Sequence, residues 1–66
     1  MTFAQKLITA REAAQLTQAE AAAELGLSRR ALQLWESGKT VPPLCAQLGA
    51  LAMLRRLAPL NPKTLP

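Results

Sequence analysis

The sequence predicts an all-α protein, a compact bundle of four to five helices, on three observations. Half of its 66 residues are hydrophobic, most of these are leucine and alanine, and only Phe3 and Trp35 are aromatic. No stretch alternates apolar and polar residues as a half-buried strand would. Apolar residues instead recur at helical spacing, between residues that commonly begin and end helices.

The composition limits the size, the compartment and the partners of the protein. Sixty-six residues form one domain at most, near the lower limit for a chain that folds without disulfides or metal. The single cysteine cannot form an intramolecular disulfide, which favours a reducing cytoplasm. Eight basic residues against four acidic ones give a net charge of +4, which favours a polyanionic partner. The apolar run from Leu48 to Leu54 is too short to span a membrane and no signal peptide is recognisable, so no membrane partner is expected.

The first predicted helix covers residues 2 to 14. Phe3, Leu7, Ala10 and Ala14 recur at i, i+4, i+7 and i+11, which places them on one inward face. Thr2 is suited to cap the start of this helix.

A second helix is predicted from residue 18 to residue 25. Thr17 is an N-cap residue, and Glu20, three residues later, completes a capping box. Strong helix formers follow, and Gly26 ends the helix because a left-handed residue there meets no Cβ clash.

A third helix follows after a tight turn, with Ser28 as its N-cap, Arg29 as its first residue and Gly38 near its end. Two short helices joined in this way have the outline of a helix-turn-helix. The chain resembles the lambda-repressor/Cro-like (xenobiotic-response-element) helix-turn-helix family over roughly residues 7 to 54. The matching residues are Arg11, Leu16, Thr17, Gln18, Ala22, Leu25, Gly26, Ser28, Leu32, Trp35, Glu36, Gly38 and Pro43. Gln15 stands where the family usually has glycine, so a strained turn is expected there, and Ala21 stands where it usually has a larger apolar residue.

The resemblance implies that helix 29–36 enters the major groove of double-stranded DNA and leads with its N-terminal residues. Its outward side carries the candidate base contacts Arg29, Arg30, Gln33 and Leu34. Arginine can donate two hydrogen bonds to guanine, glutamine can pair with adenine or contact phosphate, and leucine can contact a thymine methyl. Phosphate contacts are expected from Gln18, Ser28, Lys39 and Thr40. The alternative for the two arginines is that they are solvated or contact only phosphates.

The resemblance also implies a structural ion pair between Arg11 and Glu36, which would fasten the first helix to the end of the third. From the residues alone, Arg11 is better explained as a solvated surface arginine. Leu32 and Trp35 are expected on the buried stripe of the third helix, with Trp35 in the core rather than stacked on a base.

The last predicted helix runs from residue 44 to residue 58. Its expected core stripe consists of Leu44, Leu48, Leu51 and Ala52, and Cys45 is expected to be a small buried residue. Apolar residues occupy other faces too, so the helix is expected to be covered on a second side by another copy of the chain. The expected dimer interface is Met53, Leu54 and Leu57. The family commonly breaks this region into two helices, which leaves four or five helices open, and residues 59 to 66 are expected to form a short tail after the domain of residues 1 to 58.

Enzymatic chemistry finds little support in the residue types. The chain contains no histidine, aspartate or tyrosine, and four scattered glutamates with one thiol do not assemble a nucleophile–base pair or a catalytic metal site. We therefore expect a protein that is not an enzyme and that uses no cofactor and no metal.

The function expected from these observations is sequence-specific regulation of transcription. A homodimer would bind a palindromic double-stranded DNA operator with half-sites about one helical turn apart, as a repressor or autorepressor. Phage regulators, antitoxins and autorepressors beside anti-CRISPR genes all fit, in the cytoplasm of a bacterial or phage-infected cell, and activation is also open. The alternative is a protein-interaction module, such as an antitoxin subunit that binds a toxin or another protein through its apolar last helix.

Overall fold

The structure is a computed structural model that describes residues 1–58. Within this range the chain forms four helices and no strand: α1 (Phe3–Ala13), α2 (Gln18–Leu25), α3 (Arg29–Ser37) and α4 (Leu44–Leu57). The predicted all-α bundle is confirmed, and its last helix is continuous. The tail expected over residues 59 to 66 lies outside the described residues. No helix of residues 1–58 is long and apolar enough to cross a membrane.

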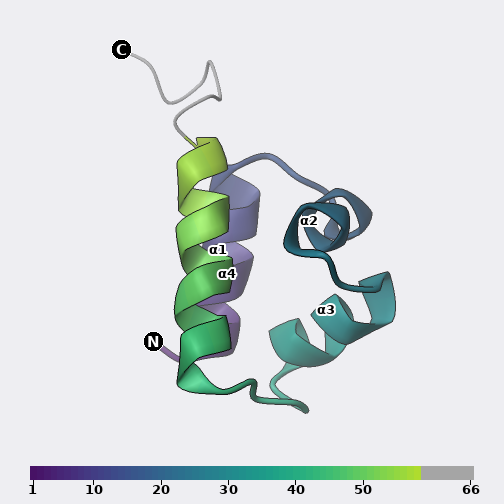
Figure 1. The fold of residues 1–66 in the computed structure, drawn as a ribbon, viewed down its shortest axis with the longest axis vertical. Helices are drawn as coiled ribbons and strands as arrows, with labels where there is room; N and C mark the ends of the chain where they lie inside the picture. The colour runs from purple at the N-terminus through teal and green to yellow at the C-terminus, as the bar shows by residue number, and fades with distance from the viewer. Residues whose placement is uncertain (59–66) are drawn as a thin grey trace.

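The four helices are arranged as two pairs. α1 and α4 run side by side in the same direction, and α2 and α3 lie together on one side of them (Figure 1). α3 contacts both α1 and α2, while α4 contacts α1 and α2. One side of α3 is therefore held against the bundle, and its other side is left outward.

The predicted boundaries of α2 and the predicted start of α3 are confirmed by their caps, and the other predicted helix ends lie within one residue of the observed ones. The Thr17 hydroxyl accepts from the backbone N–H of Glu20, whose carboxylate accepts from the backbone N–H of Thr17. The Ser28 hydroxyl accepts from the backbone N–H of Ala31 at the start of α3. α2 and α3 both end at glycines in the left-handed conformation, Gly26 at φ +71° and Gly38 at φ +80°. Cap chemistry is local, which explains why these boundaries could be located from neighbouring residues.

Gln15 adopts the same left-handed conformation, with φ +56°, in the turn between α1 and α2. A side chain with a Cβ atom is disfavoured there, because the Cβ comes too close to the following carbonyl oxygen. The strain expected where the family usually has glycine is therefore present.

The core is built from small and medium apolar side chains contributed by all four helices. Its buried members are Leu7, Ala10, Ala21, Ala22, Leu32, Ala50, Leu51 and Leu54. Trp35 is partly buried and packs against this cluster, and its ring meets that of Phe3 edge-on, with centroids 6.1 Å apart. Trp35 is thus a packing residue, as predicted.

Three expectations for α4 were wrong. Leu54, expected at a dimer interface, is fully buried in the core of the single chain. Leu44 and Leu48, expected in the core, are 66% and 60% exposed, and Cys45, expected to be buried, is exposed as well. Ala52 of the expected core stripe is also exposed.

The error lies in the rotation of α4 about its own axis. The face that meets α1 and α2 is centred on Ala50, Leu51 and Leu54. Because α4 is apolar nearly all round, its sequence pattern is compatible with several rotations, and the neighbouring helices select one of them.

Candidate nucleic-acid interface

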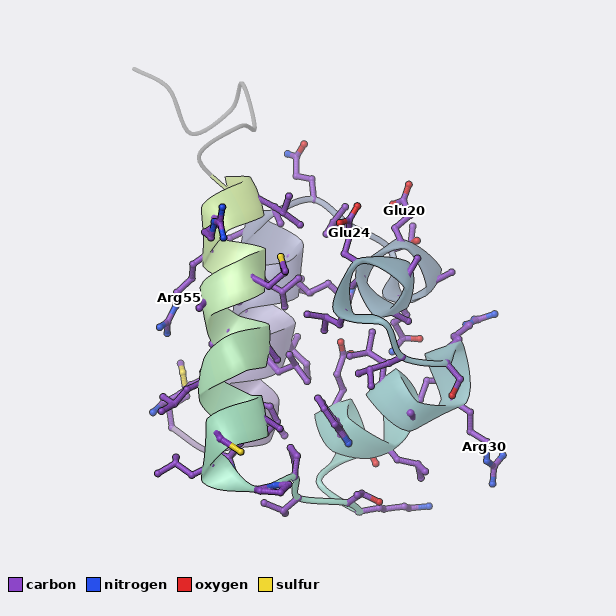
Figure 2. All side chains as sticks on the ribbon, viewed as in Figure 1. Glu20, Glu24, Arg30 and Arg55 are labelled. Atoms are coloured by element: carbon purple, nitrogen blue, oxygen red, sulfur yellow. The ribbon has the colours of Figure 1, made fainter. Side chains whose placement is uncertain are left out.

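The outward side of α3 carries the side chains predicted to read DNA bases. Leu32 and Glu36 are buried on the inward side, so Arg30 and Gln33 are left exposed and Leu34 half-buried. Arg29, three residues before Leu32, is exposed because it is the first residue of α3. Figure 2 shows Arg30 projecting away from the bundle at the first turn of α3. The burial of one stripe thus presents the opposite stripe to solvent.

Several of these side chains line one surface hollow of about 270 Å³. Its lining residues are Arg30, Gln33, Leu34, Ser37 and Lys39. They combine cationic donors, an amide that both donates and accepts, and an apolar side chain, which are the groups that recognise base edges and phosphates in the major groove. Ser37 was not predicted, although its position one helical turn after Gln33 was a signal that could have identified it.

The remaining predicted contacts lie outside this hollow. Ser28 and Arg29 lie at the N-terminal end of α3, where the Ser28 hydroxyl is engaged as the helix cap. Thr40 lines a different hollow, together with Phe3 and Trp35, and its backbone N–H donates to Leu34 O across 3.3 Å. The α3 surface therefore gathers Arg30, Gln33, Leu34 and Lys39, but not Thr40.

An ion pair between Arg11 and Glu36 connects the inward side of α3 to α1. Arg11 Nε donates to Glu36 Oε2 across 2.7 Å, Nη2 donates to Glu36 Oε1 across 3.3 Å, and Nη1 donates to Leu16 O across 3.0 Å. The two side chains are only 16% and 6% exposed. The paired hydrogen bonds fix the orientation of α3 relative to α1, and Arg11 is not available to DNA.

Gln18 is part of the same network rather than a free side chain at the start of α2. Its Nε2 donates to Glu36 Oε1 across 3.1 Å, and its Oε1 accepts from Gln33 Nε2 across 3.3 Å. The sequence offered no signal for these contacts, because the partners are 18 and 15 residues away from Gln18. The predicted phosphate residue is thus linked to a predicted base-reading residue.

The charges are distributed so that the outward side of α3 is basic. Within residues 1–58, Arg29, Arg30 and Lys39 form no ion pair. Glu20 and Glu24 project from α2 at the top of the molecule, away from Arg30 (Figure 2). Arginines in the first turn of α3 oppose the positive end of its helix dipole, at a cost of a few tenths of a kcal/mol each. An anionic ligand at this helix start would offset that cost.

Comparison with known proteins gives one match. A family model described as helix-turn-helix matches residues 7–44, more than half of the chain, from within α1 to the first residue of α4. No curated protein and no solved structure matches the chain significantly. The matched range includes the outward side of α3 and the network behind it.

Proposed function

This chain belongs to the lambda-repressor/Cro-like helix-turn-helix family of DNA-binding proteins, and on that premise we propose that it is a sequence-specific regulator of transcription. α3 enters the major groove of its operator. Arg29, Arg30, Gln33 and Leu34 contact base edges, and Gln18, Ser28, Lys39 and Thr40 contact phosphates. The protein acts in the cytoplasm of a bacterial or phage-infected cell, as a repressor, including of its own promoter.

The observation that carries this proposal is the outward side of α3. It gathers Arg30, Gln33, Leu34 and Lys39 around one hollow while the opposite side is packed in the core. An α-helix with its side chains is about 10–12 Å across, which fits a major groove about 12 Å wide. Hydrogen-bond donors of Arg30 and Lys39 also find no carboxylate partner within residues 1–58.

We further propose a homodimer formed through α4, so that two copies of α3 meet a palindromic operator. Met53 is 38% exposed although it is apolar, and Leu57 is half-buried. Met53 lines a hollow of about 330 Å³ together with Leu27, Trp35 and Gly49. A partner side chain that enters this hollow would bury apolar surface of both copies.

A second candidate function is a protein-interaction module, such as an antitoxin subunit that binds a toxin. The exposed Leu44 and Leu48 favour it, because they place two large apolar side chains on a solvent-facing part of α4. In this case α4 binds the partner and DNA contact is secondary.

The experiment that tests DNA reading is selection of bound duplexes from a random library with the full chain, followed by anisotropy titrations. We expect an enriched motif with two-fold symmetry. Replacing both Arg29 and Arg30 with alanine should reduce the preference for this motif over scrambled DNA by about 100-fold, because two base contacts are lost.

The matched control is the double variant Arg55→Ala/Arg56→Ala, which removes the same charge from α4. Arg55 projects from the opposite side of the molecule to Arg30 (Figure 2). The control should retain the motif preference within about twofold. An unchanged preference in the Arg29→Ala/Arg30→Ala variant, or the absence of any enriched motif, would overturn the proposal and favour the protein-interaction module.

A further inference from the structure

We infer that Gln18 is a positioning residue that sets the base preference of Gln33, and that the base read by Gln33 is adenine. The inference rests on the proposed function and adds to it the orientation of the Gln33 side-chain amide. Four side chains carry it: Arg11, Glu36, Gln18 and Gln33, which come from α1, α3, α2 and α3.

The network starts at the buried carboxylate of Glu36. An ionised carboxylate only accepts hydrogen bonds, so every group that faces it must be a donor. Arg11 provides Nε at 2.7 Å and Nη2 at 3.3 Å. The third neighbour is the side-chain amide of Gln18 at 3.1 Å, and it must present its nitrogen. The ion pair therefore fixes which end of the Gln18 amide points inward.

The orientation of Gln18 then fixes that of Gln33. Because Nε2 of Gln18 faces Glu36, its oxygen Oε1 lies on the other branch of the amide. This oxygen can only accept, and it receives Gln33 Nε2 across 3.3 Å. Gln33 is exposed, so without this bond its amide would be free to rotate in solvent. Rotation of the Gln33 amide by half a turn would bring two carbonyl oxygens together, which disfavours it.

Gln33 is thereby left with its Oε1 and one N–H for a base. Adenine offers a donor at N6 and an acceptor at N7 in the major groove, which matches one acceptor and one donor. Guanine offers two acceptors, N7 and O6, and would need two donors, of which Gln18 occupies one. Thymine and cytosine each offer a single hydrogen-bonding group in the major groove, so each can pair with only one of the two free hydrogen-bonding groups of the Gln33 amide. The arrangement therefore discriminates in favour of adenine.

The test uses Gln18→Lys and duplexes derived from the motif that the wild-type chain selects. A lysine ammonium can donate to Glu36 but cannot accept from Gln33 Nε2, and it still attracts phosphate. Gln33→Ala first identifies the base pair that Gln33 reads, as the position whose preference it removes. Wild-type protein should prefer adenine over guanine there by about tenfold, measured as the ratio of Kd values.

With Gln18→Lys this ratio should fall to within about twofold, while preferences at all other positions remain. The double variant Gln18→Lys/Gln33→Ala should show no further change at that position, because the two residues act together. If Gln18 only contacted phosphate, Gln18→Lys would change the affinity for all duplexes by one factor and leave the adenine preference intact, which would overturn the inference.

Two further results separate the possible failures. A wild-type chain that selects no motif contradicts the proposed function itself. A motif in which the Gln33 position prefers a base other than adenine contradicts only the inference. Gln18→Met, which removes all hydrogen bonds of the amide at similar volume, replaces Gln18→Lys if the lysine variant fails to show helical circular dichroism, and it should lower the adenine ratio in the same way.

Discussion

Arg11 and Glu36 lie 25 residues apart in the sequence, and their side chains meet through a hydrogen bond of 2.7 Å that joins α1 to the end of α3. The pair lies between the core and the outward side of α3. Its core side consists of packed helices, and its outer side continues through Gln18 to Gln33. The stability of the fold and the geometry of the candidate interface therefore share one charged contact.

Replacing Arg11 with methionine should lower the free energy of unfolding by about 3 kcal/mol, because it leaves the Glu36 carboxylate nearly buried without its cation. Urea denaturation followed by circular dichroism measures this change. The double variant Arg11→Met/Glu36→Leu should recover most of the loss, since no buried charge remains. A loss for Arg11→Met no larger than that for the exposed Arg55→Ala would show that the pair is not structural.

Replacing Gln15 with glycine should stabilise the protein by about 0.5–1 kcal/mol. Glycine tolerates φ +56° without a Cβ contact, and the gain exceeds the extra chain entropy of glycine in the unfolded state. Ala23→Gly is the matched control, because Ala23 is exposed within α2 and glycine there should cost about 1 kcal/mol. Thermal unfolding should therefore shift the Tm in opposite directions for the two variants, and a lower Tm for Gln15→Gly would contradict the assigned strain.

Replacing Leu54 with alanine should cost about 2–5 kcal/mol, because Leu54 is fully buried in the single-chain core and its removal leaves a cavity. Leu48→Ala, at a residue 60% exposed on the same helix, should change stability by no more than about 0.5 kcal/mol. Chemical denaturation at several protein concentrations makes the comparison. If the cost of Leu54→Ala varied with protein concentration, Leu54 would belong to an interface between copies after all.

Replacing Met53 with glutamate should convert the proposed dimer into monomers, because a carboxylate would enter the apolar hollow lined by Leu27, Trp35 and Gly49. Sedimentation velocity measures the change in mass. Leu48→Glu introduces the same charge on a different side of α4 and should leave the dimer intact. Monomers from Leu48→Glu but not from Met53→Glu would assign the dimer contact to the Leu48 side.

Much of the fold could be predicted because its signals are local. Thr17 with Glu20, Ser28, Gly26 and Gly38 each act within one helical turn, so neighbouring residues suffice to locate the ends of α2 and α3. The outward side of α3 could be predicted for a similar reason. Leu32 needs burial, and helical geometry then sends Arg30 and Gln33 outward, whereas Arg29 is exposed because it is the first residue of α3.

The ion pair between Arg11 and Glu36 was predictable only through the resemblance to a known family. The residues alone favoured a solvated arginine, since no residue near Arg11 indicates that it pairs with a carboxylate 25 residues later in the sequence. The contacts of Gln18 with Glu36 and Gln33 were indicated neither by the neighbouring residues nor by the family resemblance.

The rotation of α4 and the network around Gln18 have a common physical origin. The hydrogen bonds of a helix cap or a turn are made by atoms of neighbouring residues, so the local sequence determines their contribution to the free energy of folding. The burial of Leu54, the exposure of Leu44 and Leu48, and the orientation of the Gln18 amide depend on which surfaces the other helices bring to them. A helix that is apolar nearly all round is compatible with several rotations about its axis, and packing against the other helices selects one of them for α4. A side-chain amide has two orientations, and the buried carboxylate of Glu36 selects one of them for Gln18.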